Sequence, residues 1–177
     1  EEKEISFKNF FIPFTTTKAV IFIIVIGFLV FFNMLFNSFV WDDLGYIIQN
    51  PLVHSFNLPL FFSKNFYNTS TQYRPLPIIY FATLWAFFNT NAFFYHFLQL
   101  CLHITNAVFL FVLLKKFVKT KFAFVSSLLF LVHPIQVESV AYIGSSVNPL
   151  FFLFGITALL LSDKNVIGWK RILTICI

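Results

Sequence analysis

Two adjacent acidic residues, Asp42 and Asp43, directly follow an uncharged apolar run, Ala19–Trp41. A carboxylate at the edge of such a run can act as a general base if it lies within about 3 Å of the proton that it removes. A sugar joined to a lipid phosphate is a substrate whose reactive group would lie at the same level. In the simpler interpretation the two acids end a helix and meet water. Asp42 and Asp43 are therefore candidate catalytic residues.

Three further residues could bind a polar substrate. Arg74 precedes a second uncharged run, 75–114. A guanidinium group can bind a phosphate through two parallel hydrogen bonds, although an arginine at this boundary can also simply reach lipid headgroups. His133 and Glu138 lie in the segment HPIQVE, where they are candidate contacts for a sugar or an acceptor.

Four polar residues recur at spacings of three, four and three within the second run: His96, Gln99, His103 and Asn106. Such spacing puts them on one face of a helix, and polar residues in an apolar helix usually face the protein interior or a cavity. Helix–helix hydrogen bonding is the simplest interpretation. His96 is also a candidate phosphate contact, and His103 a candidate sugar or acceptor contact. The two histidines lie roughly 10 Å apart along the helix, so no metal site is predicted.

The composition indicates the environment that positions these groups. Of 177 residues, 59% are hydrophobic, 11% are charged and 29 are phenylalanine. Soluble domains carry about a quarter charged residues, and a soluble fold of this size could not bury so many aromatic side chains. The composition excludes a soluble globular domain, a disordered chain and a disulfide scaffold. It predicts an integral membrane protein with an all-α fold, a bundle of transmembrane helices.

A membrane-spanning helix needs about 20 apolar residues. The run 75–114 is divided at Asn89–Asn91, because 76–88 is too short to cross the membrane. We interpret 76–88 as a helix that lies in the membrane interface. The expected order is a cytoplasmic segment 1–18, a first span 19–41, an external loop 42–91 with the interfacial helix 76–88, and further spans at about 92–114, 122–132 and 149–161, with another beginning at 172.

Positive charge sets the expected orientation, because cytoplasmic flanks are rich in Lys and Arg. With the N-terminus in the cytoplasm, all of the 12 Lys and Arg residues except Lys64 and Arg74 fall on the cytoplasmic side. The candidate groups then gather on the external face. The chain begins without Met and ends within an apolar run, 172–177, so we expect it to be part of a longer protein.

Several short motifs occur in a characteristic order: WDD at 41–43, YRPL at 73–76, the His96–His103–Asn106 stripe, and HPIQVESV at 133–140. Over about 39–162 the chain resembles the membrane region of the O-mannosyltransferases that join transmembrane spans to tetratricopeptide repeats, and their bacterial relatives. These are polytopic glycosyltransferases of the GT-C type.

The resemblance implies inverting transfer of a mannose-like sugar from a polyprenyl-phosphate donor, dolichyl- or undecaprenyl-linked, to an acceptor hydroxyl outside the cytoplasm. The acceptor would be a protein or a glycan. The catalytic acidic residue of the first external loop corresponds to Asp42 or Asp43. The implied location is a multi-pass protein of the bacterial inner membrane or the endoplasmic reticulum. The repeats of that family would follow the membrane region, since this chain contains no 34-residue repeat.

The residues suggest a mechanism in which Asp42 or Asp43 removes the acceptor proton. Arg74, with His96, would stabilise the phosphate leaving group, while His133, Glu138 and His103 would hold the sugar or acceptor. The residues do not decide whether a cofactor takes part, so a divalent cation stays open, and no nucleic acid partner is expected. Two alternatives are a transporter or lipid flippase that uses the polar stripe, and a non-catalytic membrane scaffold.

Overall fold

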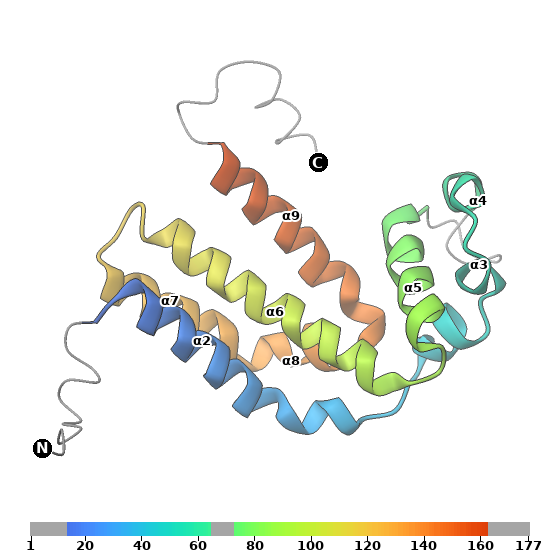
Figure 1. Ribbon diagram of the computed structural model, residues 1–177, viewed down its shortest axis with the longest axis horizontal. Helices are drawn as coiled ribbons and strands as arrows, with labels where there is room; N and C mark the ends of the chain where they lie inside the picture. The colour runs from blue at the N-terminus through green and yellow to red at the C-terminus, as the bar shows by residue number, and fades with distance from the viewer. Residues whose placement is uncertain (1–13, 65–72, 163–177) are drawn as a thin grey trace, which may run out of the picture.

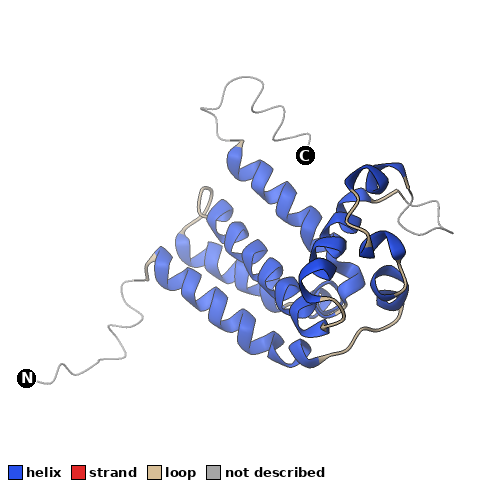
Figure 2. Cartoon of the chain, turned by 45° about the vertical axis from the view of Figure 1, so that its right-hand side comes forward, coloured by secondary structure: helices blue, strands red, loops and turns tan. Residues whose placement is uncertain are grey.

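The computed structural model describes residues 14–64 and 73–162, all of them helical or in short connections. No strand occurs in these two ranges (Figure 2), so the prediction of an all-α helical bundle is confirmed. The elements are α2 (Thr16–Phe31), η1 (Phe32–Phe36), η2 (Leu44–Ile48), α3 (Pro51–His54), α4 (Leu58–Ser63), α5 (Pro75–Phe88), α6 (Ala92–Leu114), α7 (Thr120–Val132), η3 (Pro134–Gln136), α8 (Val137–Ala141), η4 (Ile143–Ser146) and α9 (Val147–Leu161).

Three helical stretches of the described chain are long and apolar enough to cross a membrane: Thr16–Phe36, Ala92–Leu114 and Ile143–Leu161. A fourth results if the bent pair Thr120–Val132 and Pro134–Ala141, which meet at 49°, counts as one span. The helix expected to start at 172 and most of the expected segment 1–18 lie outside the described residues.

The first span differs from the expected 19–41 at both ends. The helix begins at Thr16, because the Thr15 side chain accepts a hydrogen bond from the Lys18 N–H at 3.3 Å. It ends at Phe36, because Asn37 has extended backbone angles (φ −73°, ψ 152°). Asn and Ser side chains compete for backbone hydrogen bonds and favour helix ends over helix interiors, and Ser38 follows Asn37 in the sequence.

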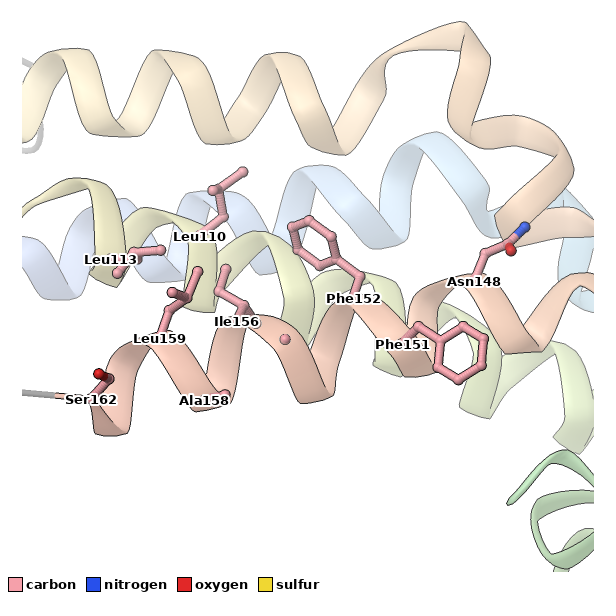
Figure 3. Close-up of a pocket in the computed structure, with 10 residues that line it drawn as sticks. Leu110, Leu113, Asn148, Phe151, Phe152, Ile156, Ala158, Leu159 and Ser162 are labelled. Carbon is pink, nitrogen blue, oxygen red and sulfur yellow. The ribbon is translucent and has the colours of Figure 1, made fainter. Parts of the chain in front are cut away.

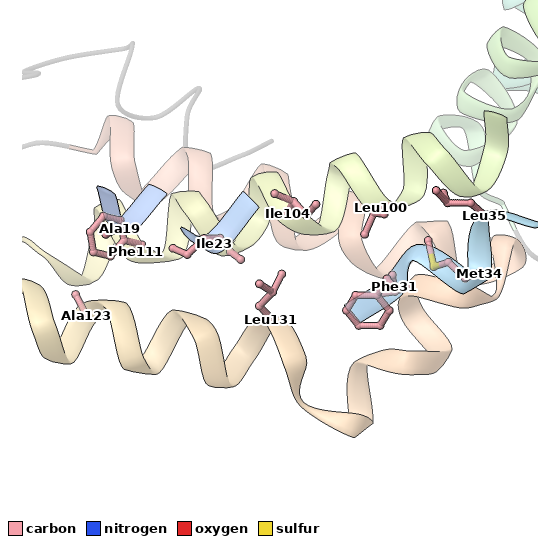
Figure 4. Close-up of a cluster of buried hydrophobic side chains, with 12 residues drawn as sticks. Ala19, Ile23, Phe31, Met34, Leu35, Leu100, Ile104, Phe111, Ala123 and Leu131 are labelled. Atoms are coloured by element: carbon pink, nitrogen blue, oxygen red, sulfur yellow. The ribbon is translucent and has the colours of Figure 1, made fainter. Parts of the chain in front are cut away.

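The bundle is organised around α6, which packs against α2, α7 and α9. In Figure 1, α6 runs between α9 on one side and α2 and α7 on the other. The core of the bundle consists of apolar side chains that meet in the interior, most of them from α2, α6 and α7 (Figure 4). The helices α2 and α6 approach closely at Gly27, where an added Cβ would lie 2.6 Å from Cγ1 of Ile104.

The helices of the bundle differ in length. The helix α6 has 23 residues, whereas α7 has 13 and α9 has 15. At 1.5 Å per residue, α6 is about 35 Å long, while α7 and α9 are about 20 Å and 22 Å long. Both short helices therefore end partway along α6, and the segment 133–146 with η3, α8 and η4 packs beside the remainder of α6.

A second group of helices, α3, α4 and α5, lies beyond one end of the bundle (Figure 1). It has its own apolar core, to which Tyr95 of α6 and Ile143 of η4 contribute. The ring of His54 stacks on Trp85 at 3.8 Å between centroids. The turn between α5 and α6 is fixed by Asn89, which has a positive φ of 50° and whose carbonyl accepts the Tyr95 Oη–H at 2.9 Å.

Candidate functional site

The candidate acidic residues lie in a tight turn. The Asp43 N–H donates to the Val40 carbonyl at 3.0 Å, and the Leu44 N–H donates to the Trp41 carbonyl at 3.3 Å. Trp41 has a φ of 49°, a conformation that is costly for a bulky residue and is retained only when the surroundings enforce it. Trp41 is 82% exposed, and Asp42 next to it is also exposed. The turn thus presents an aromatic ring and a carboxylate side by side.

Asp43 is completely buried, unlike its neighbour. Its Oδ2 accepts the Val40 N–H at 3.0 Å and its Oδ1 accepts the Gly144 N–H at 2.7 Å. Burial raises the pKa of Asp43, an effect that the two N–H groups oppose and the charge of Asp42 reinforces. Because both carboxylate oxygens are engaged, Asp43 links the turn to a segment 101 residues away in the sequence.

Gly144 and Tyr142 form the other side of this link. A Cβ on Gly144 would lie 2.6 Å from the Tyr142 ring and 3.1 Å from Asp43 Oδ1, so a larger residue here would displace the Tyr142 ring. The Tyr142 ring meets the Trp41 ring edge-on, with centroids 5.9 Å apart. Burial, with the nearby charges of Asp42 and Asp43, raises the pKa of Tyr142 to about 12. Sequence reasoning missed both residues, and the Gly-Ser-Ser break at 144–146 was the signal available for them.

The polar stripe of α6 binds the backbone of the segment that follows α7. The Gln99 side chain, fully buried, donates through Nε2 to the Ser139 carbonyl at 2.8 Å and accepts the Ser146 hydroxyl hydrogen bond. His103 Nε2 bonds the Leu131 carbonyl at 3.0 Å, and Asn106 Nδ2 donates to the Pro149 carbonyl at 2.8 Å. These three side chains supply hydrogen bonds at the points where the shorter helices end.

His96, the fourth member of the stripe, is 1% exposed. Its ring lies near the backbone of Asn37 and Ser38, yet neither ring nitrogen has a hydrogen-bond partner. Within the described residues, access to this imidazole therefore requires movement of the 37–38 segment.

Arg74 lies at the start of α5 and is half-buried. The Oη–H of its neighbour Tyr73 donates to the Phe62 carbonyl of α4 at 3.1 Å, which places Arg74 beside α4. In the described ranges no ion pair joins Arg74 to Asp42 or Asp43. The structure brings the two aspartates together with Tyr142.

His133 and Glu138 are both exposed. His133 ends α7, and its Nδ1 accepts the Ile135 N–H at 3.2 Å, which leaves its Nε2 toward solvent. Glu138 lies in the first turn of α8. The two side chains therefore occupy the surface of the segment whose backbone Gln99 holds.

Two hollows border this segment. A cavity of about 160 Å³ is lined by polar and apolar side chains of α6, α7, η3, α8 and α9: His103, Asn106, Phe130, Gln136, Ser139, Asn148, Pro149 and Phe152. A larger apolar groove of about 920 Å³ runs between α6 and α9. Figure 3 shows Leu110 and Leu113 of α6 near Ile156 and Leu159 of α9, with Asn148 at the opposite end from Ser162.

The described residues contain no group of three or more His, Cys, Asp or Glu side chains that could hold a metal ion. Asp43 already accepts two backbone N–H groups, so the adjacent Asp42 would offer a cation an isolated carboxylate. Ca²⁺ and Mg²⁺ need several oxygen ligands, and the residues at the turn do not fit a resident divalent cation.

Comparison with known proteins shows what this chain is similar to. It is 30% identical over 138 residues to protein O-mannosyl-transferase TMTC3 of Homo sapiens, which covers 73% of this chain and 15% of that protein. It is 32% identical over 148 residues to protein O-mannosyl-transferase F38B6.6 of Caenorhabditis elegans, covering 76% of the chain and 21% of the relative. Against TMTC1 of Homo sapiens the identity is 33% over 141 residues, 73% of the chain and 16% of the relative.

The resemblance inferred from the motifs is thereby confirmed. The chain spans about a fifth or less of the length of these relatives. No model of a protein family matches the chain, and no solved structure is similar to it.

Proposed function

Since the chain is similar over about three quarters of its length to proteins named protein O-mannosyl-transferase, we propose that it forms membrane helices of a glycosyltransferase. The enzyme moves a mannose-like sugar from a polyprenyl-phosphate donor to an acceptor hydroxyl on the extracytoplasmic side, with inversion. The observation that carries the proposal is the exposed Asp42 carboxylate in a turn that the buried Asp43 fixes. The acceptor is a protein or a glycan.

In this proposal Asp42 is the general base. Its carboxylate takes the proton from the acceptor hydroxyl as the oxygen forms a bond to the anomeric carbon. The bond between that carbon and the phosphate oxygen breaks on the opposite face, which inverts the configuration, and the lipid phosphate leaves with the electron pair. Asp43 is completely buried, so an acceptor hydroxyl does not reach it in this conformation, and we assign it the positioning of Asp42.

The remaining candidates contact the substrates. Arg74 binds the donor phosphate, an arrangement that needs α5 to approach the turn when donor is bound. His96 joins it only when the segment 37–38 moves away from the imidazole. His133 and Glu138, both exposed on one segment, contact the sugar or the acceptor, and His103 supports them from the bundle interior.

The surroundings of the polar stripe favour a transferase over a transporter or flippase. A transport path through the bundle would be marked by charged side chains within the membrane. Instead, Gln99, His103 and Asn106 each bond a backbone carbonyl of a neighbouring element. We propose a multi-pass protein of the endoplasmic reticulum or bacterial inner membrane, with its N-terminus in the cytoplasm.

The test is an assay of the full-length protein in lipid vesicles with a radiolabelled polyprenyl-phosphate mannose and a peptide acceptor. Asp42→Asn should lower kcat at least 100-fold, because general base catalysis contributes roughly 10²–10⁴-fold. Gln49→Glu is the matched control, an exchange between amide and carboxylate at an exposed position of the same segment, and should leave kcat unchanged. Full activity of Asp42→Asn would refute the assignment of the base.

A further inference from the structure

The cavity of about 160 Å³ contains a buried hydrogen-bond acceptor that lacks a donor. Asn106 is 1% exposed, and because its Nδ2 donates to the Pro149 carbonyl, its Oδ1 is fixed as the acceptor. This Oδ1 is buried and has no partner. Leaving a buried acceptor unpaired destabilises the fold, so an occupant that donates a hydrogen bond is expected here.

His103 supplies a second acceptor to the same cavity. Its Nε2 bonds a carbonyl oxygen, that of Leu131, and must therefore carry the hydrogen. The Nδ1 of the neutral ring is then an acceptor. The lining also includes the side-chain amides of Gln136 and Asn148 and the hydroxyl of Ser139, but no Asp, Glu, Lys or Arg. The chemistry that fits is an uncharged group with several hydroxyls.

The size of the cavity suits one small ring. A cavity of about 150 Å³ in another protein interior accommodates benzene, and this one has about 160 Å³. Whereas that example is apolar, the acceptors of Asn106 and His103 favour a ring that carries hydroxyl groups. The six-membered ring of a monosaccharide has this chemistry.

The apolar groove continues from the cavity. Asn148 and Phe152 line both hollows. From Asn148 the groove follows α9 to Ser162 (Figure 3), a length of about 20 Å. Its other lining residues are Leu, Phe, Ile, Ala and Gly of α6 and α9, so a hydrocarbon chain would lie in it without burying a polar group.

We propose that cavity and groove together bind an uncharged glycolipid, with one sugar ring in the cavity and its hydrocarbon chain along α9. The absence of charged side chains from both linings distinguishes this site from one for a phosphate-linked donor. The inference stands on the acceptors and the shared residues, and it does not depend on the proposed transferase activity.

The test is saturable binding of a radiolabelled dodecyl mannoside to the full-length protein in phosphatidylcholine nanodiscs. Competitors are dodecanol, dodecyl phosphate and methyl mannoside. Dodecyl mannoside should compete at least tenfold better than each of these. Equal competition by dodecanol would show an ordinary lipid groove, and the absence of saturable binding would show that following helices cover it. Either result overturns the proposal.

Gly155→Phe is the decisive variant, because a Cβ at Gly155 meets no atom within 4 Å and the ring would fill the groove without a clash. Leu129→Phe, at a position of α7 that is 61% exposed and lines neither hollow, is the matched control. Ser139→Leu fills the cavity. Affinity should fall at least tenfold in Gly155→Phe and Ser139→Leu and stay unchanged in Leu129→Phe. Unchanged affinity in Gly155→Phe would overturn the proposal even if Ser139→Leu failed to fold.

Discussion

Two identical side chains one residue apart have opposite surroundings in this protein. Asp42 is exposed beside Trp41, while Asp43 is buried with both oxygens bonded to N–H groups. A reactive carboxylate must reach its substrate, and its orientation depends on neighbours that do not move. Asp42 therefore has the exposure that contact with a substrate requires, and Asp43 has the fixed neighbours that hold the turn in one orientation.

The protonation of Asp43 couples the turn to pH. Burial raises its pKa above the ordinary value of 3.8, so the folded chain keeps a proton that the unfolded chain has already released. The contribution of Asp43 to the stability of the fold is complete below pH 3.8 and declines as the pH rises from there to the raised pKa. Thermal unfolding in detergent should show a Tm that falls over this interval, and Asp43→Asn should remove that fall. A wild-type Tm that rises over the same interval would contradict the expected direction.

At the scale of elements, the unequal lengths of the bundle helices explain the polar stripe. Because α7 ends beside the middle of α6, the backbone carbonyl of Leu131 meets α6 instead of water. In a membrane such a group must find a partner within the protein. His103 supplies it, and Gln99 does the same for the connecting segment. Asn106 donates to the Pro149 carbonyl in the first turn of α9.

The packing of α2 on α6 yields a stability prediction. Gly27→Ala would place a Cβ 2.6 Å from Cγ1 of Ile104 and should cost roughly 1–3 kcal/mol through overpacking. Ile104→Ala alone should cost about 2–5 kcal/mol, and the double variant should cost less than the two together, because the smaller side chain relieves the overlap. Unfolding by denaturant in mixed micelles measures all three. Gly155→Ala, where the Cβ meets open space, is the control, and strict additivity would argue against the contact.

Much of the helical framework follows from the sequence, because long uncharged runs have few alternatives to helices in a membrane. The end of the first span at Phe36 does not follow, since the apolar run continues to Trp41 and the backbone turns at Asn37 instead. The link between Asp43 and Gly144 could not be predicted either, because no local pattern relates residues 101 positions apart. The assignment of Asp42 as the proposed base depends on that link, so the sequence alone left both aspartates as candidates. By contrast, the common helical face of Gln99, His103 and Asn106 followed from their spacing.

For the whole molecule, the charge distribution predicts an orientation. Phe117, 77% exposed between α6 and α7, should face the cytoplasm, while Ile135, 75% exposed after α7, should face the other side. In a full-length variant without its native cysteines, a membrane-impermeant thiol reagent applied from outside should label Ile135→Cys. It should label Phe117→Cys only after the membrane is opened. The reverse pattern would invert the topology and remove Asp42 from the extracytoplasmic side.

The bond between Asp43 and Gly144 has a consequence for biosynthesis. The turn with Asp42 leaves the ribosome about a hundred residues before the glycine that holds it, so during synthesis the turn is made before Asp43 has this partner. The turn can be fixed in place only after η4 has been made. It is thus ordered late although it is translated early, and a nascent chain arrested before residue 144 would lack an ordered turn.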